Sequence, residues 1–508
     1  MTTAFRTYAK ENGGRVSLLL LLFVLAIYEF ITAGFAPFAV VCAIPLVAII
    51  IIVTFHYRMF AFWALIAVNH LVMWHSAPMP HGIPTSFYNE MLEIVLIVLA
   101  IIDVKEAKFE RLGNAMFFCL IIWCGFGTLE ILNDTCGLGI NVGAWYQGAR
   151  MMAYQIMYAF IVFTLYVTTP KILTKYLYVW GAFALFACFW VWTQKYIGFT
   201  QAENSWLQGA GRTTHIIQGG TLIRYFSIYS DAANFGVGIA STAVAFIIFG
   251  ITSKIRKHRI FFLVTGFACA WAMFPSGTRT AIACLMAGFM TYIFLSKSFK
   301  IAIPVTVIFG LFIFILAFTT IGQGNSQIRR MRSAFDRNDA SAGARSINQA
   351  TMKKYMKEAP WGIGLGMYGQ QVPANNKYRL MSTIPADSEY VFIWLRTGVI
   401  GITLFLIVNA IIIFGGCWIV FFILKSPSLR GIGAGFCCAM VSQQLGGYGN
   451  MVLLQFPNCL NFYGGMAIVY VLPYIENEWI AYESKQLAIQ EEKQHLKQEK
   501  KRASRVKL

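Results

Sequence analysis

Two arginine side chains at the edges of apolar segments are the strongest candidates for chemistry in this sequence. Arg224 precedes the apolar segment that starts near Asn234, and Arg279 lies within one turn of the start of another, in the motif SGTRTA. A charged residue at the centre of a membrane helix costs about 2.5–3.5 kcal/mol, and less near the interface, so Arg279 requires an explanation. The planar guanidinium group matches the oxygens of phosphates. We therefore predict that Arg224 and Arg279 bind a diphosphate headgroup.

Polar residues near these arginines favour a binding site. Arg212 and His215 lie in the same polar segment as Arg224, and Arg345 lies in the helix-like run ARSINQATMKKYMKE. We expect Arg212 to join the phosphate site, and His215 and Arg345 to contact the acceptor or the loop. The alternative for Arg224 and Arg279 is that each anchors its helix at the interface without a ligand, because long basic side chains reach from apolar segments to water.

Two carboxylates end the longest polar segment of the chain. Asp387 and Glu389 flank Ser388 just before a new apolar run, and Tyr390 follows. A carboxylate beside a phosphate site can take a proton from a sugar hydroxyl, which is general base catalysis. We predict that Asp387 or Glu389 has this role, and that Tyr390 contacts the acceptor. The alternative for Asp387 and Ser388 is that they cap the helix beginning at Glu389.

Motifs for nucleotides, metals and disulfides are weak. Three glycines in WGIGLGMYG suggest a nucleotide loop only superficially, since the Walker and dinucleotide patterns are missing, and they indicate a tight turn with close backbone packing. The histidines at the end of the third apolar run match no zinc pattern, and we expect no metal. The glycines are Gly362, Gly364 and Gly366, and the histidines are His70, His75 and His81. A disulfide between Cys136 and Cys459 is an open alternative.

Composition identifies a membrane protein. Of 508 residues 58% are hydrophobic and only 12% are charged, about half the charge of a soluble protein. Runs of about 20 apolar residues, enough to cross a bilayer, recur along the whole chain. The one after Arg15 is too long for a cleaved signal and is interpreted as the first span. The predicted spans are 16–34, 37–55, 59–75, 86–102, 113–131, 150–168, 176–195, 233–252, 260–275, 278–296, 301–320, 398–424, 431–446 and 460–475.

The charge pattern predicts the topology and the domains. With the N-terminus inside, the inside segments contain 25 of the 41 Lys and Arg residues, as expected for cytoplasmic loops, so the net charge of +19 does not indicate nucleic acid. Most of the remaining basic residues gather in the outside segments 196–232 and 322–396, including Arg329, Arg330, Arg332 and Arg337. We predict an N-terminal bundle of about 11 helices (1–320), a basic periplasmic loop (321–397), C-terminal membrane helices (398–475) and a cytoplasmic basic tail (476–508).

Several motifs in this order resemble the O-antigen ligase/polymerase superfamily of bacterial envelope glycosyltransferases. They are Arg224 with the following NFG, SGTRTA around Arg279, the large loop with its helix from Arg345, the glycine-rich turn after Pro360, and LRTGVIG, and together they cover about 224–422. The apolar runs and the charge pattern predict an all-α polytopic fold with about 12–14 transmembrane helices and a large periplasmic loop containing short helices, and the resemblance implies that this fold is of the GT-C type. It implies a donor oligosaccharide on undecaprenyl diphosphate and no cofactor, with Arg224 and Arg279 at the family's diphosphate-binding positions.

One departure from the family pattern favours the polymerase branch. Ligases typically carry a histidine just before the span that follows the loop, whereas this chain has Asp387-Ser388-Glu389 there and no histidine between His258 and His495. We therefore predict a polysaccharide polymerase of the bacterial inner membrane, with both termini cytoplasmic. The expected partners are membrane lipid and polysaccharide assembly proteins such as a chain-length regulator. The alternatives are an O-antigen ligase or protein O-oligosaccharyltransferase, and a flippase of the lipid-linked sugar.

Overall fold

The chain separates into two compact units, residues 1–64 and 65–508. The computed structural model describes residues 57–77, 84–217, 222–297, 319–324, 326–332 and 340–506, with scattered positions between 14 and 54 and between 303 and 318. Of the first unit it describes little beyond the start of helix α4 (Arg58–Leu71). The predicted spans 16–34 and 37–55, most of 301–320, and residues His81 and Arg337 lie outside the described residues.

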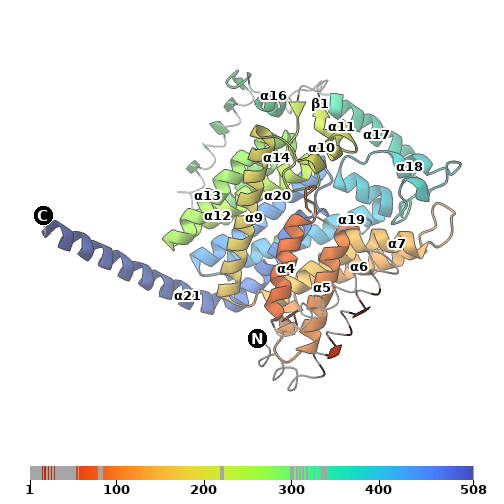
Figure 1. Ribbon diagram of the computed structural model, residues 1–508. Coiled ribbons are helices and arrows are strands. Elements are labelled where there is room, and N and C mark those ends of the chain that lie inside the picture. Colours follow the sequence, from red (N-terminus) through yellow and green to blue (C-terminus); the bar gives the residue numbers. More distant parts are fainter. Residues whose placement is uncertain are drawn as a thin grey trace. The chain divides into compact units, whose positions relative to one another are not determined.

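The second unit is built almost entirely of helices (Figure 1). The only sheet in the described part of the chain is a two-residue hairpin, in which Ile216 pairs with Ile223 and Ile217 with Leu222. Its helices and strands are α5 (Thr85–Ile102), η1 (Phe109–Leu112), α6 (Ala115–Leu129), η2 (Glu130–Leu132), α7 (Val142–Ala149), η3 (Arg150–Tyr154), α8 (Gln155–Tyr166), α9 (Pro170–Tyr196), α10 (Gln201–Gln208), α11 (Arg212–His215), β1 (Ile216–Ile217), β2 (Leu222–Ile223), α12 (Ala232–Thr252), α13 (Arg256–Ala272), η5 (Phe274–Ser276), α14 (Arg279–Leu295), α16 (Ser326–Arg332), α17 (Ala340–Met356), η7 (Gly369–Gln371), α18 (Arg379–Thr383), α19 (Glu389–Trp418), η8 (Ile419–Ile423), α20 (Pro427–Gly449) and α21 (Asn458–Val506).

The all-α polytopic fold predicted from the sequence is confirmed. Seven helical segments in the described residues are long and apolar enough to cross a membrane, and α4 and α14 are shorter apolar helices. The seven are Thr85–Ile102, Ala115–Leu132, Val142–Tyr166, Pro170–Tyr196, Ala232–Thr252, Arg256–Ser276 and Glu389–Ile423. Local signals set several starts. Thr169 caps α9 ahead of Pro170, and Asp231 accepts hydrogen bonds from the amides of Ala233 and Asn234 at the start of α12, as expected of capping residues.

Helix α12 is the centre of the bundle. It is buried along almost its whole length and packs against α13, α14 and α20. Large rings fill the space around its second half, where Trp180 lies edge-on to Phe246 at 4.9 Å and stacked on Phe436 at 5.8 Å between ring centroids. Gly435 on α20 lets Phe249 approach, because a β-carbon there would overlap the ring, as expected for close helix packing in membranes.

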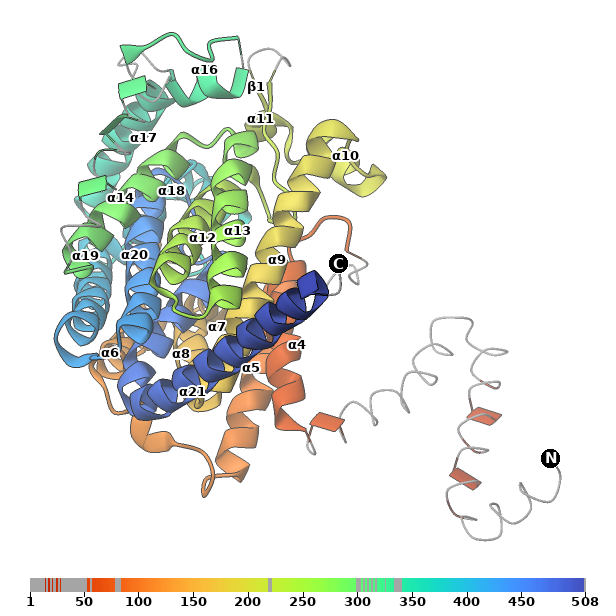
Figure 2. The same cartoon turned by 90° about the vertical axis from the view of Figure 1, so that its left-hand side faces the viewer.

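The loops sort to two ends of this bundle. At the end that we call the site end, the side chain of Asn133 donates to the carbonyl of Trp361, and the main-chain amide of Tyr225 donates to the carbonyl of Pro275. Helices α10, α11, α16, α17 and α18 gather there in both views (Figures 1 and 2). At the opposite tail end, Lys254 pairs with Glu483 at 3.0 Å. Which of the two ends faces the inside of the membrane stays a prediction.

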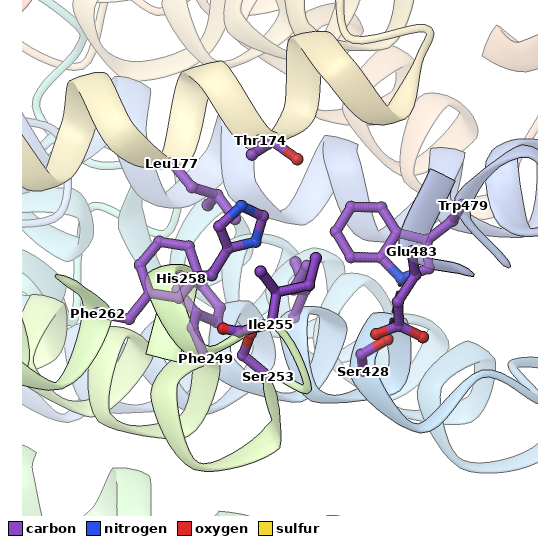
Figure 3. A pocket seen from close by; sticks show the side chains of 11 residues that line it. Thr174, Leu177, Phe249, Ser253, Ile255, His258, Phe262, Ser428, Trp479 and Glu483 are labelled. Carbon is purple, nitrogen blue, oxygen red and sulfur yellow. Dashed lines mark hydrogen bonds between the residues drawn. The ribbon is translucent and has the colours of Figure 1, made fainter. Parts of the chain in front are cut away.

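Helix α21 closes the tail end. Glu476 accepts hydrogen bonds from the amides of Lys425 and Ser426, just before α20, and the indole of Trp479 donates to Ser428. Figure 3 shows Trp479, Glu483 and Ser428 on one side of a cavity and His258 on the other. The cavity has a volume of about 10 Å³. That volume holds about one water molecule. The tail end is therefore packed shut at this point.

The glycine-rich segment hooks into a break in α19. At Gly398 the backbone leaves the helical conformation (φ 67°), and the amides of Ile363 and Gly364 bond to the carbonyls just before the break, at 2.9 and 3.0 Å. A β-carbon on Gly398 would overlap the carbonyl of Pro360. The prediction of close backbone packing is confirmed. Helix α19 begins at Glu389, nine residues before the predicted span, and the break lies at that span's predicted start.

Candidate functional site

A cluster of four arginines lies at the site end, and we call Arg224, Arg279, Arg330 and Arg345 the arginine cluster. Arg224 follows strand β2, and its main-chain amide donates to the carbonyl of His215 on the other side of the hairpin. Its guanidinium donates to the carbonyls of Ser276 and Thr214, at 3.2 and 3.0 Å, and to the hydroxyl of Thr278 at 3.0 Å. The hairpin thus places Arg224 on the turn that leads into α14.

That turn depends on Gly277. The short helix η5 ends there because Gly277 adopts a left-handed conformation (φ 59°), which is unfavourable for residues with a β-carbon. A β-carbon would lie 3.3 Å from Cδ of Arg330 and 3.4 Å from Cγ of Arg224. Arg330, from helix α16, also donates to the carbonyl of Gly277 at 2.8 Å. One glycine therefore brings together arginines that are 106 residues apart in the chain.

The arginine cluster concentrates positive charge. Burial and, after it, the charges of Arg330, Arg279 and Arg345 lower the pKa of Arg224 to about 10. Asp231 opposes them. Arg224 remains protonated at neutral pH, and like charges in a partly desolvated site repel one another. Such an arrangement favours an anionic ligand with several oxygens, such as a diphosphate.

His215 holds the start of α12. Its Nε2 accepts a hydrogen bond from the amide of Ala232 at 2.9 Å, and its Nδ1 lies 3.1 Å from the carbonyl of Gly211. The ring therefore carries its proton on Nδ1. Burial, and then the charge of Arg224, lowers the pKa of His215 to about 4, so the ring is neutral. In this structure His215 positions the helix that follows Asp231, and its predicted contact with an acceptor stays a prediction.

The two predicted carboxylates point to different surroundings. Asp387 is exposed and has a left-handed backbone (φ 48°). Glu389 is buried and accepts a hydrogen bond from the amide of Leu453 at 2.9 Å. Ser388 occupies the capping position of α19, but its hydroxyl donates to the carbonyl of Gly447. Ser388 therefore does not cap the helix through its side chain, contrary to one alternative.

Comparison with known families bears directly on this geometry. Residues 264–406 match a family model described as O-antigen ligase. We call residues 264–406 the O-antigen ligase segment, after the family model that they match. The match includes Arg279, Arg330, Arg345, Asp387 and Glu389. It confirms the resemblance to the O-antigen ligase/polymerase superfamily and supports, in general terms, a glycosyltransferase-like function on lipid-linked glycans. No curated protein matches the chain.

Parts of the site lie outside the O-antigen ligase segment yet contact it. One of these parts is Arg224. The other is the segment of residues 450–457 between α20 and α21, which we call the return loop. The side-chain amide of Asn450 donates to the hydroxyl of Thr280, one residue after Arg279. Gln455 and Phe456 contact the start of α12, through Ser230 at 2.7 Å and Asn234 at 2.8 Å. The return loop thus joins α12, α14 and, through Leu453, the first turn of α19.

Sequence reasoning missed the return loop because it carries no charge. The one sequence signal for this loop was a set of amide side chains within it and just after it, in an otherwise apolar stretch, at Asn450, Gln455, Asn458 and Asn461. Such amides inside a membrane protein need hydrogen-bonding partners. Asn458 finds its partner in Asn234, whose carbonyl and side chain both accept from it.

The other predicted contacts lie at the edges of the site. Arg212 is exposed at the start of α11. Arg345 lies on α17 and belongs to the arginine cluster through its charge. The hydroxyl of Tyr390 donates to the carbonyl and side chain of Gln444, both at 2.8 Å, which fixes the ring against α20.

Metal and disulfide chemistry find no support in the described part of the chain. No group of three His, Cys, Asp or Glu side chains there has the arrangement of a metal site. His70 bonds to the carbonyl of Ile66 and to Asn461, and His75 to the carbonyl of Ser230. Cys136 and Cys459 are both free thiols, and Cys136 lies against the carbonyl of Ile363. The open alternative of a Cys136–Cys459 disulfide is therefore not realised.

Proposed function

We propose that the protein is a polysaccharide polymerase that transfers an undecaprenyl-diphosphate-linked glycan onto the next lipid-linked repeat unit at the periplasmic face. The observation that carries the proposal is the arginine cluster, in which Arg224 and Arg330 meet at Gly277 beside Arg279. Three of its four arginines lie within the O-antigen ligase segment. A diphosphate that leaves from a sugar gains negative charge as the bond breaks, so preorganised guanidinium groups stabilise that transition state.

The reaction assigns a different task to the carboxylates. A hydroxyl oxygen of the acceptor attacks the anomeric carbon of the donor, the bond from that carbon to the diphosphate oxygen breaks, and undecaprenyl diphosphate leaves with the bonding electrons. The hydroxyl proton goes to a general base. Asp387 is exposed and suits this task, whereas an oxygen of Glu389 is already bonded to the return loop. We assign the base to Asp387 and a positioning role to Glu389.

The proposed topology follows from the charge pattern and from the two ends of the bundle. The predicted division into an N-terminal bundle, a basic periplasmic loop, C-terminal membrane helices and a cytoplasmic tail is retained as part of the proposal. The arginine cluster and the return loop then face the periplasm, and α21 with its basic end faces the cytoplasm of a bacterial inner membrane.

Two other functions have specific support. A ligase is favoured by the description of the matched family, but the histidine expected of ligases is missing between His258 and His495. A flippase is favoured by Glu93, which is buried on α5 one turn after Glu90, since ionisable residues within the membrane often mark transport paths.

Elongation in a purified system tests the proposal. The protein in nanodiscs is given lipid-linked repeat units extracted from cells that lack it, and the products are separated by length. A polymerase yields glycans of two or more repeats. A ligase yields product only when a separate lipid or protein acceptor is added, and a flippase yields no longer glycan.

A pair of arginine variants connects elongation to the cluster. Arg279→Ala removes one of the groups that stabilise the leaving diphosphate, and we expect a loss of roughly 10²–10³ in rate. Arg256→Ala is the matched control, because Arg256 is exposed at the tail end, and its rate should equal that of the wild type. Equal rates for both variants would overturn the diphosphate assignment.

A further inference from the structure

A cavity opens at the site end, separate from the arginine cluster. It has a volume of about 630 Å³, which lies within the range of small-ligand sites. Its walls come from the start of α5, the junction of α7 and α8, the segment around Tyr368 and the return loop. Apolar side chains, including Met151 and Phe456, form much of the surface. The polar groups used below are Ser86, Tyr146, Arg150, Gln155 and Gln455, and we call the cavity the Arg150 pocket.

The charge of Arg150 is compensated within its own surroundings. Its guanidinium donates to a carboxylate oxygen of Glu90 at 2.7 Å and to the hydroxyl of Ser86 at 2.9 Å. The other oxygen of Glu90 accepts from the hydroxyl of Tyr146 at 3.1 Å. The Arg150 pocket thus offers many hydrogen-bonding groups without excess charge, in contrast to the arginine cluster.

Two buried donors beside this pocket lack a hydrogen-bond partner. Nε of Arg150 and Nε2 of Gln155 have none among the described residues, although both residues are more than nine-tenths buried. Buried donors are normally paired, so each such exception requires an explanation. The backbone supplies a second sign, because Arg150–Tyr154 form a π-helix between α7 and α8. Such local departures from the α-helix are frequent at functional sites.

A short chain of contacts links the Arg150 pocket to the arginine cluster. Gln455 lines the pocket, and its side-chain oxygen lies 2.7 Å from the hydroxyl of Ser230. The same hydroxyl lies 2.9 Å from a carboxylate oxygen of Asp231, whose charge acts on Arg224. The return loop and the start of α12 therefore border both sites.

We propose that the Arg150 pocket binds the sugar residues of the acceptor chain. The inference rests on the proposed function, in which the arginine cluster holds the donor's diphosphate and a second saccharide has to approach beside it. A saccharide suits the Arg150 pocket because its hydroxyl groups can accept from the unpaired donors of Arg150 and Gln155. Its apolar ring faces can lie on the tyrosines and on Phe456. The charge balance of the pocket selects against a free diphosphate.

Two soluble probes separate the Arg150 pocket from the arginine cluster. The first is the repeat-unit oligosaccharide released from the carrier lipid, which has no diphosphate, and the second is farnesyl diphosphate, which has no sugar. Saturation-transfer NMR on protein in nanodiscs measures the binding of each. Gln155→Leu removes an unpaired donor while keeping the side chain's size, and Gln371→Leu is the control, since Gln371 is exposed on η7 outside the pocket.

We expect Gln155→Leu to weaken oligosaccharide binding at least tenfold and to leave farnesyl diphosphate binding unchanged. Arg279→Ala should have the opposite effect, and Gln371→Leu should affect neither probe. A second variant, Met151→Trp, fills the pocket and should also abolish oligosaccharide binding. Unchanged oligosaccharide binding in both pocket variants overturns the inference, and so does loss of farnesyl diphosphate binding in Gln155→Leu. Failure of the wild type to elongate lipid-linked repeats would instead contradict the proposed function.

Discussion

Substituting Gly277 tests whether the turn before α14 sets the geometry of the arginine cluster. In Gly277→Ala the new methyl group lies 3.3 Å from Cδ of Arg330 and 3.4 Å from Cγ of Arg224. Ordinary contacts between carbon atoms are about 3.5–4.0 Å, so the two arginines have to move by roughly 0.3–0.5 Å. A misplacement of about 1 Å can reduce an enzymatic rate about 10²-fold, which scales to a loss of ~4–10-fold here.

The effect of backbone strain in Gly277→Ala has to be distinguished from the effect of displacing the two arginines. Gly277 has a φ of 59°, and alanine in that conformation costs about 1–2 kcal/mol. Gly137→Ala is the matched control, because Gly137 has a φ of 64° and nothing within 4 Å of the position of its β-carbon. Both variants should lose similar thermal stability, measured as apparent Tm in nanodiscs. Only Gly277→Ala should slow the elongation of lipid-linked repeat units. Equal elongation rates in the two variants would refute the argument that the turn positions the arginines.

Two further predictions concern the carboxylates and the buried histidine. Asp387→Asn removes the proposed base, and we expect a rate loss of about 10²–10⁴ at unchanged Tm. Glu389→Leu leaves the amide of Leu453 without its partner and should cost about 1–3 kcal/mol of stability; a lower Tm in Asp387→Asn than in Glu389→Leu would contradict both assignments. Burial lowers the pKa of His215 to about 4, whereas the unfolded chain titrates near 6.5. As the pH falls from about 6.5 toward 4, the unfolded state takes up a proton that the folded state does not, so stability declines by about 3 kcal/mol. Thermal unfolding between pH 7.5 and 4.5 should show this slope in the wild type and a flatter one in His215→Asn; parallel slopes would rule out His215 as its source.

The membrane helices could be predicted because their signals are local. Apolar length predicts a crossing segment, and residues such as Thr169, Pro170 and Asp231 start helices through contacts within a few residues. Predicted and observed boundaries therefore agree closely for α12 and α14. The start of α9 was predicted six residues late, because Thr169 and Pro170 were not used as a start signal.

The partners within the site could not be predicted, because they depend on tertiary packing. Arg224 and Arg279 were identified from their cost inside an apolar chain. That Arg330 would join them at Gly277 depends on how α16 folds back over the turn, and no local pattern contains this information. The pairing of Arg150 with Glu90 across 60 residues has the same origin. A charged residue in an apolar segment can be recognised from the sequence, but the residue that it contacts in the folded protein cannot.

The break in α19 fixes the size of one part of the segment between α17 and α19. Residues 360–364 are clamped against the helix at Gly398, and the chain re-enters the same helix at Glu389. The residues between these two points therefore form a closed ring, because both of its ends are fixed to α19. An insertion in this ring would have to extend outward from it or break the hydrogen bonds between residues 360–364 and α19. Natural variants that handle longer or shorter repeat units should accordingly differ in length before Met356 and not within the ring, and engineered tags should follow the same rule.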